Sequence, residues 1–102
     1  MGINNIHQIL SNEEIKTAIE ELDTGWELKE DKIVKSFQFP SFMKAIEFVN
    51  DVARIAERLN HHPIMTINWR QVKLSLKSFD VDAITKRDIN LAKEIEKRRE
   101  KN

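Results

Sequence analysis

One long apolar stripe constrains the fold of this chain more than any other feature. Between Phe42 and Leu59, apolar side chains recur at the offsets that place them on one face of a helix. Pro40 and Ser41 precede the stripe, and a serine before a helical period is a favoured N-cap. We therefore expect a central helix over residues 42 to about 60, built on the apolar positions Phe42, Ala45, Ile46, Val49, Val52, Ala53, Ala56 and Leu59.

The central helix must stop at the motif His61-His62-Pro63. Proline lacks the amide hydrogen that a helix needs, and it disfavours the helical conformation at the residue before it. The two histidines are therefore expected in a loop at the helix exit. Because imidazole titrates near neutrality, such a pair can exchange protons at physiological pH. Taken alone, however, adjacent histidines before a proline are more often a solvated helix end.

Alternation of apolar and polar residues predicts a hairpin on each side of the central helix. Residues 26–39 alternate around a charged turn at residues 30–31, and residues 65–76 alternate around a polar turn at residues 70–71. The aromatic residues that fit this alternation are expected in the core or in an interface: Trp26, Phe37, Phe39 and Trp69.

Two capping motifs predict a helix near each end of the chain. Ser11 and Glu14 form a Ser-x-x-Glu box before an apolar helical period, and Thr85 and Asp88 offer a similar cap to a last helix. Two hairpins with one apolar face each are most economically covered by these helices. The predicted fold class is therefore α+β, a four-stranded antiparallel sheet with three helices on one face, in the order α-β-β-α-β-β-α. Its outer strand edges invite pairing with a second copy.

Composition limits the classes of function. A chain of 102 residues fits a single domain over residues 1–102, of which about 1–10 and 98–102 are expected to be mobile. Seventeen basic and seventeen acidic side chains cancel, which argues against direct binding to nucleic acid or an anionic membrane. No cysteine is present, so thiolate chemistry and cysteine-bound zinc are excluded. No apolar run approaches the roughly 20 residues of a membrane span, so we expect a cytoplasmic protein.

Residues around the histidine pair resemble a known family. The run over residues 57–63 is Glu-Arg-Leu-Asn-His-His-Pro, an aromatic residue follows at Trp69, and residues 87–92 are Arg-Asp-Ile-Asn-Leu-Ala. This combination is similar to the pterin-4a-carbinolamine dehydratase family, and the likeness covers residues 11–97 approximately. It implies a 4a-hydroxytetrahydropterin dehydratase, a lyase that forms quinonoid dihydropterin and recycles the pterin without a metal or cofactor. It also implies association through the sheets into a homodimer or homotetramer.

The resemblance further implies which residues form the site. Elimination of water needs an acid at the 4a-oxygen and a base at the adjacent ring nitrogen, and a histidine pair can supply both. His61 and His62 are the expected catalytic residues, with His61 favoured for proton transfer and His62 for holding the pterin. Glu57, one helical turn earlier, is expected to orient His61 or raise its pKa if the helix persists that far, and is otherwise a surface charge of the helix. Asp88 is expected to orient a histidine or a pterin nitrogen, with a role in capping alone as the alternative. The full set of expected substrate-binding residues is Glu57, Asn60, Pro63, Lys77, Ser78, Phe79, Asp80 and Asp88.

Phe79 is the main departure from the family pattern. Family members most often have a third histidine at this position, and phenylalanine can stack on a pterin but cannot move a proton. We therefore expect reduced dehydratase activity. Two other hypotheses remain: a pterin-binding protein of another pathway with weak or no activity, and a dimerisation or coactivator partner that uses the long central helix.

Overall fold

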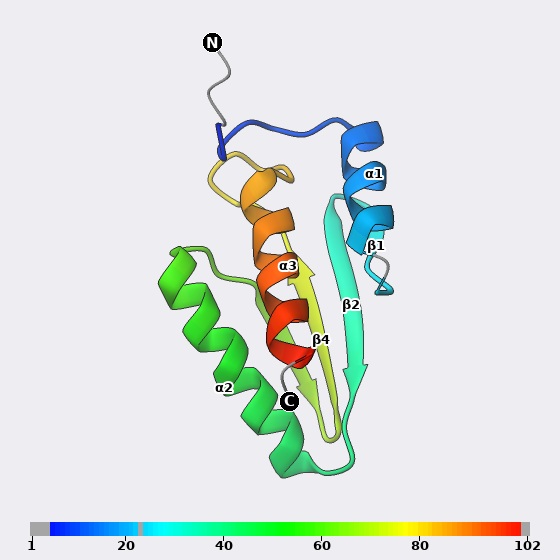
Figure 1. Ribbon diagram of the computed structural model, residues 1–102, viewed down its shortest axis with the longest axis vertical. Helices are drawn as coiled ribbons and strands as arrows, with labels where there is room; N and C mark the ends of the chain where they lie inside the picture. The colour runs from blue at the N-terminus through cyan, green and yellow to red at the C-terminus, as the bar shows by residue number, and fades with distance from the viewer. Residues whose placement is uncertain (1–4, 23, 101–102) are drawn as a thin grey trace.

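The computed structural model describes residues 5–22 and 24–100, so the expected mobility of residues 1–4 and 101–102 lies outside the described part. The predicted order of elements and the α+β fold class are confirmed (Figure 1). The elements are α1 (Asn12–Leu22), β1 (Glu27–Lys29), β2 (Lys32–Gln38), α2 (Phe42–Leu59), β3 (Ile64–Asn68), β4 (Gln71–Leu76) and α3 (Lys86–Glu100).

The four strands form one antiparallel sheet in the order β1-β2-β4-β3. Each predicted hairpin forms, and the two hairpins join through β2 and β4, in a register that runs from Ile33 opposite Leu76 to Gln38 opposite Gln71. Within the described strands, β1 and β3 are therefore the two outer strands. This arrangement leaves the whole of β3 along one edge of the sheet.

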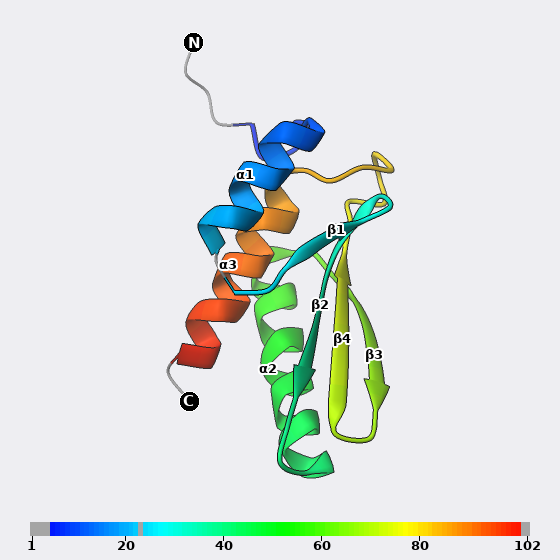
Figure 2. The same cartoon turned by 90° about the vertical axis from the view of Figure 1, so that its right-hand side faces the viewer.

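All three helices lie on one side of the sheet, as Figure 2 shows. The apolar strand residues that face them are deeply buried because each pleat points alternate side chains toward the helices. Ile33, Phe37, Val72, Leu74 and Leu76 are each exposed by 2% or less. Helices α2 and α3 supply most of the opposing apolar surface, through Ala45, Phe48, Val52, Ile55, Ile89, Leu91, Ala92 and Ile95.

The predicted N-cap of α2 is present, and a C-cap that was not among the sequence predictions fixes where the helix ends. Ser41 accepts a hydrogen bond from the amide of Lys44, as expected of an N-cap. At the other end Asn60 adopts the left-handed conformation with φ 52°, which asparagine tolerates better than most residues. The His61 amide then donates to the Ala56 carbonyl over 3.0 Å. The helix therefore closes immediately before the histidine pair.

Three of the four aromatic positions lie at least partly in the core, but Trp69 does not. Trp26 and Phe37 are buried and meet edge to face at 6.0 Å, and Phe39 is half-buried. Trp69 lies in the β3–β4 turn at φ 54° with 66% of its surface exposed, and the Arg70 guanidinium stacks 4.3 Å from its ring. Trp69 is therefore not a core residue, because it belongs to the turn and not to the strand alternation, and the alternative of an interface position stays a prediction.

One partly buried ion pair at the edge of the core has no counterpart among the sequence predictions. Lys35, between two apolar positions of β2, points toward the helices and contacts the Glu96 carboxylate at 2.6 Å. The Trp26 indole donates to the same carboxylate oxygen over 2.9 Å. The end of α3 is thereby attached to the first hairpin.

The burial pattern predicts very different costs for two truncations. Leu74→Ala removes a fully buried side chain from the central strand β4, and it should lower the free energy of unfolding by about 2–5 kcal/mol because a cavity remains. Met43→Ala on α2, where the side chain is 65% exposed, should change it by no more than about 0.5 kcal/mol. Urea unfolding followed by circular dichroism measures both, and equal effects would contradict the observed core.

Candidate active site

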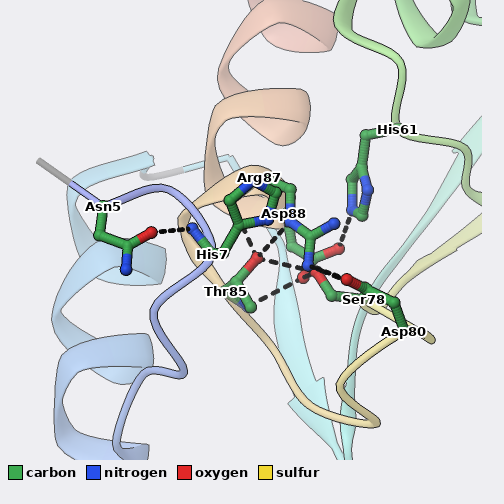
Figure 3. A network of polar contacts seen from close by, with 8 residues as sticks. All are labelled: Asn5, His7, His61, Ser78, Asp80, Thr85, Arg87 and Asp88. Atoms are coloured by element: carbon green, nitrogen blue, oxygen red, sulfur yellow. Dashed lines mark hydrogen bonds and ion pairs between the residues drawn. The ribbon is translucent and has the colours of Figure 1, made fainter.

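His61 is a buried histidine at the exit of α2. Its side chain is 9% exposed, and its Nε2 lies 2.7 Å from Oδ1 of Asp88, which is fully buried (Figure 3). The two residues are 27 positions apart, so this contact joins the α2–β3 loop to the first turn of α3. Of the two partners expected for Asp88, a histidine and a pterin nitrogen, the structure shows contact with the histidine His61.

The second carboxylate oxygen of Asp88 is held by the start of α3. Oδ2 accepts hydrogen bonds from the Ser78 hydroxyl at 2.8 Å and from the Thr85 amide at 3.0 Å. The Thr85 hydroxyl lies 2.8 Å from the Ser78 hydroxyl and accepts from the Arg87 amide and Nε at 3.2 and 3.3 Å. A buried carboxylate needs such donors to offset its lost hydration. Asp88 is therefore both a helix cap and the partner of His61.

This arrangement selects the nitrogen of His61 that can act on a ligand. A carboxylate only accepts hydrogen bonds, so a neutral His61 carries its proton on Nε2 when it bonds Asp88. The lone pair then resides on Nδ1. The fixed partner orients the ring, and Nδ1 is the atom that can take up and return a proton.

His62 lies outside the buried network and contacts Glu57. Its Nε2 is 2.5 Å from Glu57 Oε2, and the two side chains are 56% and 78% exposed. The expectation that Glu57 orients His61 was therefore wrong. The left-handed Asn60 ends the helix before the pair, and adjacent residues of an extended segment point to opposite sides. His61 turns inward to Asp88, and its neighbour remains beside the surface carboxylate.

The loop that follows β4 presents Phe79 to solvent. Phe79 is 55% exposed, and the loop closes where Ser78 and Ala83 exchange backbone hydrogen bonds of 2.9 and 3.2 Å. Both oxygens of Asp80 accept from Arg87, at 2.8 and 3.1 Å. The hydrogen bond from Arg87 holds the pKa of Asp80 below its ordinary value. The Phe79 loop is thus attached to the polar network that holds His61.

Lys77 has its charge paired with two carboxylates from other segments. Its side chain is only 5% exposed, and its ammonium contacts Asp31 of the β1–β2 turn and Asp82, the latter at 2.5 Å. The hydrogen bond from Lys77 is the main cause that lowers the pKa of Asp31 to about 2, and the same bond raises the pKa of Lys77. Nothing in the sequence indicated the role of Asp31, because it lies 46 residues from Lys77.

The expected site residues fall into an inner and an outer group. His61, Ser78 and Asp88 contact one another directly or through one partner, and Thr85 is an inner residue that the sequence predictions assigned only to capping. The outer residues lie on the same two loops or beside them: Glu57, Asn60, His62, Pro63, Lys77, Phe79 and Asp80. A separate cleft of about 680 Å³ lies between α2 and the end of α3, lined in part by Phe39, Phe48 and Arg98. None of the expected site residues lines this cleft.

Within the described residues, no group of three His, Asp or Glu side chains could hold a metal ion.

Comparison with known proteins identifies the family. The family model described as pterin 4 alpha carbinolamine dehydratase matches residues 8–98. The chain belongs to the pterin 4 alpha carbinolamine dehydratase family. A relative from Roseiflexus sp. (strain RS-1), named "Putative pterin-4-alpha-carbinolamine dehydratase", is 45% identical over 87 residues, which cover 85% of this chain and 92% of the relative. A relative of the same name from Nocardia farcinica (strain IFM 10152) is 40% identical over 87% of this chain and 93% of its own length.

Two solved structures share this fold. The transcriptional coactivator/pterin dehydratase from Brucella melitensis superposes with a TM-score of 0.82 at 30% identity, over 87% of this chain and 96% of its own. A pterin dehydratase-like protein described as a RuBisCO assembly factor in the alpha-carboxysome gives 0.61 at 17% identity, over 72% and 88%, and it is similar in fold alone. No helix in the described ranges is long and apolar enough to cross a membrane.

The carboxylate of Asp31 should titrate far below its ordinary range. Its pKa is lowered from 3.8 to about 2, so the pair with Lys77 stabilises the fold above pH 4 approximately and is lost as the pH falls toward 2. Side-chain carboxyl shifts followed by NMR from pH 6 to pH 1.5 should give this midpoint. In Lys77→Met the midpoint should return most of the way to 3.8, and Lys32→Met should move it less. A midpoint near 3.8 in the unaltered chain would contradict the observed pairing.

Proposed function

We propose that this protein is a 4a-hydroxytetrahydropterin dehydratase that eliminates water by acid–base catalysis at His61. The observation that supports this most is the buried pair of His61 and Asp88. Because Nε2 of His61 is bonded to Asp88, Nδ1 is the ring nitrogen that would exchange a proton with the substrate. Membership of a dehydratase family is consistent with this chemistry. The physiological substrate in this proposal is a small pterin with a hydroxyl group on carbon 4a.

The proposed reaction needs two proton movements. Hydroxide is a poor leaving group, so an acid must protonate the 4a-oxygen as the carbon–oxygen bond breaks, and a base must remove the proton of the adjacent ring nitrogen. His61 can perform one movement through Nδ1. His62, exposed and paired with Glu57, has an imidazole that can hold the pterin and assist in the other. Phe79 stands where family members most often have a third histidine, so water or His62 must supply the proton transfer of that imidazole. Turnover should therefore be slower.

Phe79 supports a second candidate function, a pterin-binding protein with weak dehydratase activity. The exposed ring beside the site offers a stacking surface but no proton. Such a protein would bind the pterin at the same residues and release it without dehydrating it. The two candidates differ in rate, which a direct assay measures.

The assay follows the absorbance of a freshly generated 4a-hydroxytetrahydropterin as it decays. The unaltered chain should exceed the buffer rate, and His61→Ala should lose roughly 10²–10⁴-fold of that acceleration. Asp88→Asn should also lose most of it, because the amide no longer fixes the Nε2–H tautomer. His7→Ala, which removes an exposed histidine outside the catalytic pair, is the matched control and should keep the full rate.

The same assay distinguishes the two candidate functions through Phe79. Phe79→His should raise the rate if the third imidazole is the missing component. An unaltered chain that does not outpace buffer, yet binds a pterin, would replace the enzyme by the binding protein. Full activity in His61→Ala would show that another group performs the proton transfer.

We also propose that the protein is a homo-oligomer formed along β3. Ile64 and Ile67 on this outer strand are 42% and 43% exposed, and an exposed strand edge offers unpaired backbone groups to a second copy. A homodimer or homotetramer would cover both the edge and these side chains. Neither nucleic acid nor a membrane has a part in this proposal.

Light scattering after size-exclusion chromatography tests the oligomer. At micromolar concentration the unaltered chain should elute as a multiple of 12.0 kDa, and Ile64→Lys with Ile67→Lys should shift it toward that mass because charges resist burial. Ile9→Lys, at a 54% exposed residue away from β3, should leave the mass unchanged. A single 12.0 kDa species for the unaltered chain would exclude the oligomer.

A further inference from the structure

A lysine with little exposed surface stands beside the most exposed aromatic ring of the site. Lys77 follows the last residue of β4, and its ammonium lies over the Phe79 ring, 5.8 Å from the ring centroid. The ammonium also contacts Asp31 and Asp82. One face of the ring is therefore turned toward an ammonium that two carboxylates pair, and Phe79 keeps 55% of its surface exposed.

The backbone that bears Phe79 is held on both sides. Ser78 donates to Asp88, and the next residue but one, Asp80, accepts two hydrogen bonds from Arg87. Asp82 is held by Lys77, which in turn contacts the β1–β2 turn through Asp31. The loop therefore has three attachments within five residues. Those at Ser78 and Asp80 belong to the His61 network, and the one at Asp82 does not.

We propose that the ion pairs of Lys77 with Asp31 and Asp82 hold Phe79 as a stacking wall for the planar ring of a pterin, and that both aspartates are positioning residues. The inference rests on the proposed function, because it requires a pterin beside His61. Ser78 links the His61–Asp88 pair to Phe79, because it contacts Asp88 and directly precedes Phe79 in the chain. The ring face turned away from Lys77 is the face that a flat heterocycle can cover.

Fixing the ring before binding matters because an aromatic contact is weakened when the side chain must first be ordered. Lysine alone would be a poor support, since a buried ammonium needs paired charge. Asp31 and Asp82 supply that charge from a different hairpin and from the loop itself. The β1–β2 turn, distant in sequence from every catalytic candidate, thereby gains a role in ligand binding.

A double-mutant cycle on binding tests the proposal without any need for turnover. The probe is 6-hydroxymethylpterin, and the dissociation constant comes from quenching of its fluorescence. Phe79→Leu should weaken binding about tenfold, as expected for a lost stacking contact. The double change Asp31→Asn with Asp82→Asn should weaken probe binding about threefold to fivefold when Phe79 is present. The same double change should weaken probe binding by less than about 1.5-fold in the Phe79→Leu variant.

Glu47→Gln is the matched control, because it removes an exposed ion pair with Lys44 on α2 and should leave the dissociation constant unchanged. Urea unfolding confirms that each variant is folded at the assay temperature. Equal losses from the aspartate changes in both backgrounds would overturn the positioning role, and so would unchanged affinity in Phe79→Leu.

The outcomes also separate this inference from the proposed enzyme activity. If the chain binds the probe with the expected coupling but does not accelerate dehydration, the positioning of Phe79 is supported and the dehydratase proposal is overturned. If the chain dehydrates its substrate but shows no coupling, the dehydratase proposal is supported and the positioning of Phe79 is overturned. Absence of any pterin binding would overturn both.

Discussion

A single buried carboxylate joins the parts of this protein that matter for its chemistry. Asp88 has no exposed surface, and its oxygens are used by His61 on one side and by Ser78 and the Thr85 amide on the other. Each donor comes from a different segment: the exit of α2, the loop after β4 and the start of α3. Because an unpaired buried carboxylate is strongly unfavourable, these segments must meet before the fold is stable. The cost of burying the charge therefore enforces the geometry of the site.

Local features of the chain were predictable because their causes are local. The Ser11 box, the Ser41 cap and the alternation of the two hairpins depend on neighbours within a few residues, and each formed as expected. The partner of Glu57 was assigned wrongly because helical spacing was extended past Asn60, where the left-handed turn redirects the chain. The left-handed backbone at Asn60 thus separates the paths of the two histidines, and the Glu57 carboxylate contacts His62.

Long-range polar pairs were beyond the reach of the sequence alone. Lys77 and Asp31 are 46 residues apart, and Lys35 and Glu96 are 61 apart. Each of these residues is also an ordinary surface charge by composition, so no periodicity distinguishes it. The sheet register brings Asp31 to the end of β4, since Ile33 lies opposite Leu76. Such pairs follow from topology, which in turn depends on the pairing of β2 with β4.

The two tryptophans of the chain occupy opposite environments, and this gives the protein two natural optical reporters. Trp26 is 3% exposed and donates to Glu96, whereas Trp69 is 66% exposed at the β3–β4 turn. Emission from the first indole is sensitive to the attachment of α3 to the first hairpin, and emission from the second to whatever approaches the outer edge of the sheet. Loss of the core and occupation of the edge therefore produce separable spectral changes in the same unlabelled molecule.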